Sequence, residues 1–494
     1  MAFNSLHFLI FLPVVIILYF VLPKKIKPIF LLLASYYFYM CAKPYLIFII
    51  VGVTLVSYFA SIRIKKVENV KLKKFILISS IVLILGTLIF FKYFNFLIHS
   101  AIDFLNLFTL SIQSVSLDII LPIGISFYTF QTLSYVIDVY QEQYDPEKNI
   151  IYYALYVSFF PQLIAGPIEK ANDLIPQLKD HHKFNREDFI AGMQLLVVGF
   201  FRKCVIADFC GIFVDGVFQD LATANSLAII AAGSLFIVQL YCDFCGYSEI
   251  AAGSARIMGI KLSKNFDRPF SSKNFTEFWS RWHMTLSRWL NDYVYLPLSF
   301  KAMNSKHPTL RHVINTFIVF TLCGLWHGAN WTFVLWGAYI GVVLAIESLI
   351  RNPLKKLEKK CKAVPIIRRV LLFAIIIFAS YLFRCQTIQE VGVAYSRLFT
   401  QFGFGGEYFT SALNSLSMHI IDIIELALIF VIMFKLYDFA YDLPSIEMQQ
   451  ESEGNLRKVS GKGLGFTLLI ICVALGWFML ISSDAASSFV YFQF

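Results

Sequence analysis

The chain has 494 residues, of which 58% are hydrophobic, 17% are aromatic and only 15% are charged. Soluble domains are about 45 to 50% apolar and about 25% charged, so this composition excludes an ordinary soluble enzyme. Lipid must therefore be the solvent for most of the chain. The net charge of +10 fits basic loops that are retained on the cytoplasmic side of a membrane. No nucleic-acid-binding motif accompanies the charge, so we expect no nucleic-acid partner.

Apolar runs separated by charged or turn residues recur along the chain. A helix needs about 20 mainly apolar residues to cross a hydrocarbon core of about 30 Å, and shorter runs can be re-entrant or buried among their neighbours. We expect an all-α polytopic membrane protein with roughly ten to twelve transmembrane or re-entrant helices. The candidate runs are residues 6–22, 29–41, 45–62, 75–98, 119–140, 151–165, 189–206, 226–245, 313–325, 331–350, 366–383, 420–437 and 464–481.

The residues around the first run predict how the chain is oriented. The run at 6–22 has no basic region before it and no small-residue cleavage site after it, which favours a retained anchor over a signal peptide. Lys24, Lys25 and Lys27 follow it, and another basic loop spans residues 63–74. Cytoplasmic loops are enriched in lysine and arginine, so we expect both loops inside and the N-terminus outside.

Two later stretches, residues 256–312 and 351–369, are also basic and hydrophilic, and we place both on the cytoplasmic face. The sequence shows no internal repeat and no flexible linker, and its hydrophilic loops are too short to form domains. It therefore predicts one membrane domain over residues 1–494.

The nine cysteines show no pattern of a metal site. Cys242 and Cys245 form a CxxC pair, but a zinc site of this kind needs a second pair, and the sequence has none. We expect two small buried residues here, and no metal or bound cofactor anywhere in the protein.

A histidine stands inside one apolar run. His327 lies in CGLWHGANWTFVLWGAYIG, residues 323–341, and an ionisable residue at such a place is a candidate functional residue. A single histidine in an apolar helix is more often a packed structural residue. Here Gly324, Gly328 and Gly337 permit close backbone approach, as a channel through packed helices requires. Burial keeps an imidazole neutral, and a neutral imidazole can act as a base.

The second candidate region is NFTEFWSRWHMTLSRWLNDYVYLPL, residues 274–298. Its large apolar side chains recur at spacings of three and four, which predicts one amphipathic helical face, typical of a membrane interface. His283 lies beside this stripe, one turn after Trp279, and the helix can carry it inward toward a channel. The members of the stripe are Trp279, Trp282, Leu286, Trp289 and Tyr293.

Further polar side chains lie in apolar runs, namely Gln131, Asp138, Gln162, Asp243 and Glu249. Each can form a hydrogen bond between packed helices, and together they suggest the lining of a polar cavity. The sequence contains no P-loop, no GxSxG elbow and no HExxH motif, which argues against nucleotide hydrolysis, serine-hydrolase chemistry and zinc-protease chemistry. Histidine-centred chemistry inside a membrane is the kind of catalysis that the sequence still favours.

Four motifs carry a resemblance to a known family. FFPQLIAGPIEK, QLYCDFCGYSEIA, FWSRWHMTLSRWLNDYVYLPL and GLWHGANWTFVLWG resemble the membrane-bound O-acyltransferase (MBOAT) family, and within it the bacterial alginate and peptidoglycan O-acetyltransferase branch. The similarity runs from about residue 5 to the C-terminus. Cys245 and Glu249 stand where this branch commonly has serine and aspartate, a departure that touches no catalytic assignment.

The resemblance implies a bundle that encloses a tunnel in a bacterial plasma membrane. It makes His327 the near-invariant histidine of the family and His283 its second histidine. We expect substrate contacts from Trp326, Asn330, Trp279, Asp243 and Gln131.

The last six residues, FVYFQF, resemble an F-x-Y-x-x-F ending of polysaccharide-acylating systems. This segment spans residues 489–494, and Tyr491 stands in it between Phe489 and Phe494. The resemblance implies that Tyr491 is a catalytic residue that carries the acyl group. The alternative is an ordinary aromatic tail at the membrane interface.

Our main hypothesis is an O-acyltransferase that moves an acyl group, expected to be acetyl, from a cytosolic thioester such as acetyl-CoA to a polysaccharide outside the membrane. The resemblance implies an extracytoplasmic SGNH-type partner that completes delivery. One alternative is a lipid or protein acyltransferase of the same superfamily. Others are a polytopic transporter, against which the missing repeats argue, and a scaffold, which leaves the buried histidines unexplained.

Overall fold

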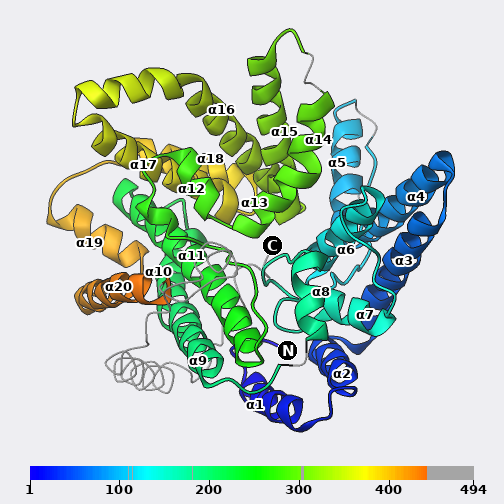
Figure 1. Cartoon of the computed structure of the whole chain (residues 1–494). Coiled ribbons are helices and arrows are strands. Elements are labelled where there is room, and N and C mark those ends of the chain that lie inside the picture. The colour runs from blue at the N-terminus through cyan, green and yellow to red at the C-terminus, as the bar shows by residue number, and fades with distance from the viewer. Residues whose placement is uncertain (109–110, 114, 181, 302–304, 442–494) are drawn as a thin grey trace. The chain divides into compact units, whose positions relative to one another are not determined.

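The computed structural model describes residues 1–441 except 109–110, 114, 181 and 302–304, and every regular element in these residues is a helix (Figure 1). The all-α expectation is therefore confirmed. Capping residues mark several helix starts: the Asn330 side chain accepts a hydrogen bond from the Thr332 N–H, and the Asn274 side chain accepts one from the Glu277 N–H.

The chain divides into two compact units. Of the described residues, the first unit holds 1–196 and 248–263, and the second holds 197–247 and 264–441. Two of the three boundaries fall inside α9 (Arg186–Phe200) and α11 (Ser226–Ile257), so each of these helices contributes to both units. The expectation of a single domain stays a prediction.

Unit 1 contains packed helix pairs, in which α3 contacts α4 and α6 while α7 contacts α2 and α8. Apart from its parts of α9 and α11, its elements are α1 (Leu6–Val21), α2 (Lys27–Met40), η1 (Pro44–Leu46), α3 (Ile47–Lys66), α4 (Val70–Leu88), η2 (Ile89–Tyr93), α5 (Phe94–Asn106), α6 (Ile125–Tyr140), α7 (Ile150–Ser158) and α8 (Ala171–Lys179).

Unit 2 is organised around the antiparallel neighbours α15 and α16, and α16 also contacts α12 and α17. Its elements, beside its parts of α9 and α11, are η3 (Phe201–Ala207), α10 (Asp208–Gln219), η4 (Pro269–Ser271), α12 (Phe275–Arg281), α13 (Met284–Leu290), η5 (Asn291–Tyr295), α14 (Leu296–Lys301), α15 (Pro308–His327), α16 (Trp331–Lys360), α17 (Val364–Arg384), α18 (Ile388–Thr400), α19 (Gly406–Ser415) and α20 (Ile420–Tyr441).

Six helical segments of the described chain are long and apolar enough to cross a membrane, and the bent pair 406–415 with 420–433 makes a seventh if it is one span. This count rests on helix length and composition alone. α1 has 16 residues and is too short to be counted as a membrane-spanning helix. The chain is thus a multi-pass membrane protein, while the expected number of ten to twelve transmembrane or re-entrant helices is not confirmed. The six segments are Pro44–Lys66, Val70–Asn106, Ser226–Ile257, Pro308–His327, Trp331–Lys360 and Val364–Arg384.

The distribution of side chains fits a lipid environment. Large apolar side chains are exposed along the spanning helices, for example Val82 on α4, Leu322 on α15 and Ile367 on α17. Polar side chains such as Lys203 and Asp243 are buried instead. A soluble protein rarely leaves so much apolar surface open to water, so these outer faces are suited to acyl chains.

The apolar run at 151–165 forms a shorter helix than expected. α7 ends at Ser158, and residues 160–166 form turns. Pro161 explains this end, because a proline disfavours helical backbone at the residue before it and lacks an N–H to donate. The chain then folds so closely that a Cβ on Gly166 would lie 2.4 Å from the Cα of Gln162.

Candidate active site

Unit 2 contains an open cavity of about 740 Å³. Residues from α12, α13 and η5 form part of its wall, and α15 and α16 supply the rest. Its lining mixes aromatic rings with hydroxyl, amide, imidazole and guanidinium groups, which suits a ligand that has both apolar and polar parts. Among the lining residues are Trp279, Trp282, His283, Asn291, Tyr295, His312, His327 and Arg351.

A pair of glycines positions His327, the last residue of α15. A Cβ on Gly324 would lie 2.2 Å from the carbonyl oxygen of Phe333, and a Cβ on Gly337 would lie 2.2 Å from that of Phe320. Only glycine allows α15 and α16 to approach this closely. The predicted close approach of backbones at these two glycines is confirmed, and it holds the end of α15 against the start of α16.

Aromatic side chains surround His327. Its ring centroid lies 5.1 Å from that of Trp326, 5.2 Å from that of Trp336 and 5.3 Å from that of Phe383. The side chain is only 8% exposed. Edge-on packing of this kind restricts the orientation of the imidazole.

The segment 274–298 is not one continuous helix. α12 ends at Arg281 and α13 begins at Met284, and His283 between them has a φ of 46°. The break leaves backbone groups without partners inside a helix, and residues 265–267 supply hydrogen bonds to two of them. Asp267 N–H donates to Arg281 O at 2.9 Å, and Met284 N–H donates to Asn265 O at 2.8 Å. The periodicity missed the break because the residues that stabilise it lie earlier in the chain.

The predicted aromatic stripe faces the interior of unit 2. Trp279, Trp282 and Trp289 are each less than 10% exposed, so the interpretation as an interfacial belt is wrong for these side chains. Their burial leaves His283 inside as well, with 1% of its surface exposed.

Asn265 fixes the orientation and the tautomer of His283. The distance from His283 Nδ1 to Asn265 Oδ1 is 3.0 Å, and Thr285 Oγ1 donates to the same oxygen, also at 3.0 Å. An amide oxygen only accepts hydrogen bonds, so Nδ1 must carry the proton and Nε2 must carry the lone pair. His283 Nε2 is buried and has no hydrogen-bond partner within the part of the chain that the structure describes. Burial also lowers the pKa of His283, which keeps the ring neutral.

The two histidines meet at one place. Their ring centroids are 6.4 Å apart, and both rings line the large cavity. Both also line a second cavity of about 60 Å³, as do Trp279 and Trp282. The four side chains therefore border both cavities, and a reacting group held between the histidines has access to each space.

Trp279 contributes a donor at the same border. Its indole Nε1–H is buried and has no acceptor among the described residues. The ring packs edge-on against Trp336 and Phe320, with centroids 5.8 Å and 5.3 Å away. A buried N–H without an acceptor costs free energy, and a ligand that supplies the acceptor removes this cost, so Trp279 is a candidate binding residue.

Two further predicted contacts, Trp326 and Asn330, lie near His327 along the chain. The ring of Trp326 lies 5.9 Å from that of His283 and 5.1 Å from that of His327, so it contacts both histidines. Asn330 uses both ends of its amide: Oδ1 accepts from Thr332 N–H, and Nδ2 donates to Gln386 O at 2.6 Å. Neither residue lines the two cavities described above, and their substrate contacts stay predictions.

Asp243 and Gln131 lie outside both cavities and belong to different units. Asp243 is 2.7 Å from the ammonium of Lys203, which also contacts Asp208 at 2.7 Å. Gln131 donates from Nε2 to Tyr156 O at 3.4 Å. These bonds give both residues a packing role within their own unit, and their predicted substrate contacts are untested.

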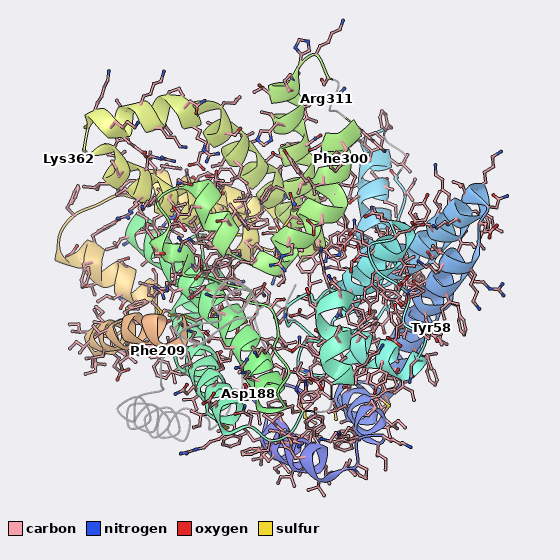
Figure 2. All side chains as sticks on the ribbon, viewed as in Figure 1. Tyr58, Asp188, Phe209, Phe300, Arg311 and Lys362 are labelled. Atoms are coloured by element: carbon pink, nitrogen blue, oxygen red, sulfur yellow. The ribbon has the colours of Figure 1, made fainter. Side chains whose placement is uncertain are left out.

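The large cavity adjoins a basic surface. Arg351 lines the cavity, and the exposed lysines that follow it continue along α16. Figure 2 shows Arg311 near the start of α15 and Lys362 just beyond α16. At the cavity wall Tyr295 Oη lies 2.7 Å from His312 Nδ1. The exposed lysines are Lys355, Lys356, Lys359, Lys360 and Lys362.

The CxxC pair lies outside the large cavity, whereas another cysteine, Cys323, lines it. Cys242 and Cys245 are buried and both are free thiols. Within the described residues, no three side chains of histidine, cysteine, aspartate or glutamate come together as metal ligands.

Comparison with known proteins decides which family has this site. Residues 147–386, which include both histidines, match the model of the membrane-bound O-acyltransferase family. The probable alginate O-acetylase AlgI of Pseudomonas aeruginosa is 33% identical, over 94% of this chain and 86% of its own length. The chain belongs to the membrane-bound O-acyltransferase family. It is therefore an acyltransferase, as its motifs predicted.

The names of two other relatives give a different acyl group or a different acceptor polymer from that of the alginate O-acetylase. The peptidoglycan O-acetyltransferase of Helicobacter pylori is 33% identical over 72% of this chain and 72% of its own length. The teichoic acid D-alanyltransferase of Bacillus subtilis is 31% identical over 52% of this chain and 65% of its own length. MBOAT relatives of this chain thus bear names for acyl transfer to several polymers of the cell envelope.

Sequence reasoning named both histidines and Trp279 but missed Asn265 and Trp282. Asn265 gave no signal, because an asparagine in a polar loop is typical of turns and only the fold brings it to His283. Trp282 was placed in the stripe, and its position at the border of the two cavities follows from the break after α12. Phe489, Tyr491 and Phe494 lie outside the described residues.

Proposed function

We propose that this enzyme transfers an acetyl group from a cytosolic thioester, acetyl-CoA, for O-acetylation of a cell-envelope or secreted polysaccharide. The observation that carries the proposal is the meeting of His283 and His327 at the border of two cavities, with a ring separation of 6.4 Å. The names of the relatives from Pseudomonas aeruginosa and Helicobacter pylori support acetyl as the group and a polysaccharide as the acceptor.

The donor enters through the large cavity. Its volume of about 740 Å³ is within the range of small-molecule sites, about 300 to 1,000 Å³. Arg351 lines it, and this arginine, together with the exposed lysines that follow it as far as Lys362, attracts the phosphates of the donor. Because basic loops are retained in the cytoplasm, this cavity opens inward and the N-terminus lies outside the bacterial plasma membrane.

The histidines and Trp279 divide the chemistry between them. His327 removes the proton of the incoming hydroxyl, whose oxygen attacks the thioester carbonyl carbon and forms the new C–O bond. The C–S bond then breaks, and His327 returns the proton to the departing sulfur, which leaves as a free thiol. Trp279 Nε1–H donates to the carbonyl oxygen as negative charge develops on it. His283, with its lone pair on Nε2, accepts a hydrogen bond from the hydroxyl and orients it.

The hydroxyl in this step belongs to Tyr491. A phenol has an ordinary pKa of about 10, so it needs a base to become a nucleophile at neutral pH. An acetyl-tyrosine at 491 passes the group to an extracytoplasmic SGNH-type partner, which completes delivery to the polysaccharide. Purified protein incubated with radiolabelled acetyl-CoA tests the relay: wild type gains a covalent label that Tyr491→Phe lacks. Equal labelling of both proteins would assign the acyl group to another residue.

Polysaccharide acetylation in cells tests the proposed function as a whole. Cells that produce the wild-type enzyme should contain base-labile acetate in the polysaccharide fraction, and cells with His327→Ala should contain none above background. His419→Ala is the matched control, since His419 is exposed and lies outside both cavities. Equal acetate from wild type and His327→Ala, at equal protein levels, would refute the proposal.

A further inference from the structure

The carboxylate of Glu347 joins three helices of unit 2. Glu347 lies on α16, and its Oε2 accepts hydrogen bonds from the Thr276 N–H at 2.7 Å and from the Thr276 hydroxyl at 2.8 Å. Its other oxygen, Oε1, accepts a hydrogen bond from Nη2 of Arg368 on α17, also at 2.8 Å. The side chains of Glu347 and Arg368 are each 14% exposed, so both charged groups are largely shielded from water. The carboxylate therefore ties the start of α12 to α16 and α17.

The helix that Glu347 holds is short. α12 has seven residues, and the backbone leaves helical geometry directly after it, at Trp282 and His283. A helix this short is not stable alone, so contacts with its neighbours set its orientation. Asn274 caps α12 by accepting from the Glu277 N–H at 2.8 Å, but both residues belong to the same short segment. The bonds from Glu347 connect this segment to a helix of 30 residues.

Trp279 lies one turn after Thr276 on α12. Residues three apart are neighbours on the surface of a helix, and these two both line the large cavity. The ring of Trp279 packs 5.8 Å from that of Trp336, which lies on α16 about three turns before Glu347. α16 thus contacts α12 at two places, through Trp336 at Trp279 and through Glu347 at Thr276. Two such contacts fix the rotation and the tilt of α12, and with them the direction of the indole N–H.

We propose that Glu347 is a positioning residue of this enzyme: by holding Thr276, it orients α12 so that the Trp279 Nε1–H is directed at the thioester carbonyl oxygen. This proposal rests on the role of Trp279 in the proposed function. A donor stabilises a developing oxyanion when it lies about 2.7 to 3.1 Å from it, so a small rotation of α12 weakens this interaction. Glu347 lines neither cavity, so its effect on the reaction passes through Trp279.

The charge of Glu347 is balanced within unit 2. The surrounding sequence, GVVLAIESLI over residues 341–350, is apolar, and an ionised side chain in a spanning helix is costly unless it is paired. Arg368 supplies the opposite charge, and Glu358 pairs with the same guanidinium through Nη1. Two carboxylates of α16 thus share one arginine, and the one that also bonds α12 is Glu347.

Thiol release from acetyl-CoA by the purified full-length enzyme tests this role. Glu347→Ala removes the acceptor of both Thr276 bonds, and a misplacement of about 1 Å at a reacting centre costs up to about 10²-fold. We expect kcat to fall by about 10- to 100-fold while KM stays within about twofold of the wild type, because the lost interaction acts only in the transition state. Glu347→Gln keeps an oxygen that accepts from Thr276, so it should restore part of the lost rate.

A double-mutant cycle distinguishes positioning from general destabilisation. Trp279→Phe removes the N–H that Glu347 orients, so adding Glu347→Ala to it should change kcat by less than about twofold. If the two residues act independently, the double variant loses the product of the two single factors, and that result overturns the proposal. Thermal unfolding of each variant confirms that it is folded at the temperature of the assay.

Glu358→Ala is the matched control. Glu358 lies on the same helix and bonds the same arginine, and within the described residues no hydrogen bond links it to α12. Its kcat should equal that of the wild type. A loss of kcat in Glu358→Ala as large as that in Glu347→Ala would assign the effect to Arg368 and overturn the proposal.

Failure of the proposal and failure of the proposed function give different results. A wild-type kcat in folded Glu347→Ala, with Trp279→Phe slowed, overturns the proposal while the proposed function stands. A wild-type kcat in Trp279→Phe removes Trp279 from the reaction, and the role of Glu347 falls with it. If the wild type consumes no acetyl-CoA, the proposed function itself fails, and so does the proposal.

Discussion

His283 donates from Nδ1 to Asn265 Oδ1 at 3.0 Å, and this bond leaves the lone pair on Nε2 at the border of the two cavities. Thr285 holds the same oxygen in place through its hydroxyl, at 3.0 Å. An uncharged residue thus sets which nitrogen of a buried histidine is free to accept a proton. A carboxylate at the same position would raise the pKa of His283, whereas the amide leaves the effect of burial unopposed.

Replacement of Asn265 tests this relationship. Asn265→Asp should raise the pKa of His283, so that Nε2 is protonated at higher pH and the acidic limb of the pH dependence of kcat/KM moves upward. Asn265→Ala should lower kcat by about 10²-fold, because the tautomer is no longer fixed. Rates measured from about pH 5 to 9 give both quantities. Identical acidic limbs in wild type and Asn265→Asp would show that Asn265 does not position a titrating His283.

The stability of the protein should also depend on pH through His283. Burial lowers the pKa of His283 in the folded chain below the ordinary value of 6.5. Between the lowered pKa and pH 6.5, the unfolded chain therefore binds a proton at His283 and the folded chain does not. The stabilising contribution is present above pH 6.5 and is lost as the pH falls toward the lowered pKa. Melting temperatures of wild type and His283→Gln in detergent check this. The wild type should lose more stability on acidification, and parallel curves would contradict it.

Trp279→Phe should slow the reaction while preserving the packing of the ring. Phenylalanine keeps an aromatic side chain beside Trp336 but removes the Nε1–H that we propose as the donor to the carbonyl oxygen. Loss of one donor to a developing oxyanion lowers kcat by about 10²- to 10³-fold. Trp289→Phe is the control, because Trp289 is also buried but lines neither cavity. Equal kcat values for the two variants would remove Trp279 from the reaction.

The contact between α15 and α16 should tolerate no side chain at Gly337. A Cβ there would meet the oxygen of Phe320 at 2.2 Å, so Gly337→Ala forces the helices apart and costs about 1 to 3 kcal/mol. The same change at Gly392 in α18, where nothing lies within 4 Å, should stabilise the protein by about 0.5 to 1 kcal/mol. Thermal unfolding compares the two. A Gly337→Ala protein as stable as the wild type would show that the helices are not held by this close approach.

Breaking the buried ion pair of Lys203 should be costly. Lys203 is fully buried between Asp208 and Asp243, and removing it takes away the positive charge that faces both carboxylates, which costs about 3 to 5 kcal/mol. Lys65→Met provides the comparison, since Lys65 pairs with Asp145 on the surface and its loss should have no measurable effect. Equal melting temperatures for Lys203→Met and Lys65→Met would contradict the structural role of this pair.

The helical architecture followed from apolar run length, and the two histidines followed from the cost of a polar residue in an apolar run. Both depend on neighbours in the sequence, which is why α16 and His327 were predictable. The break at His283 depends instead on hydrogen bonds that Asn265 accepts and that Asp267 donates, and both residues approach it only in the folded chain. The spacing of the large apolar residues therefore predicted one helix where the structure has two, α12 and α13.

Asp243 shows a different limit of prediction from sequence: its burial was predictable, but its partner was not. Its place in an apolar run suggested a polar cavity, but the rule that makes buried charges functional candidates does not say which partner neutralises them. The structure pairs it with Lys203 in the adjoining η3 element, a partner that no spacing in the sequence indicated. The two cavities were likewise unpredictable, because they depend on how α11, α12, α15, α16 and α17 pack.

The release of free thiol from acetyl-CoA by purified protein tests the central claim most directly, since it needs neither the acceptor polysaccharide nor a partner protein if Tyr491 takes the acetyl group. Wild type and His419→Ala should release thiol in one turnover, and His327→Ala should release it about 10² to 10⁴ times more slowly. A His327→Ala protein that is folded and releases thiol at the wild-type rate would contradict the assignment of His327 as the base.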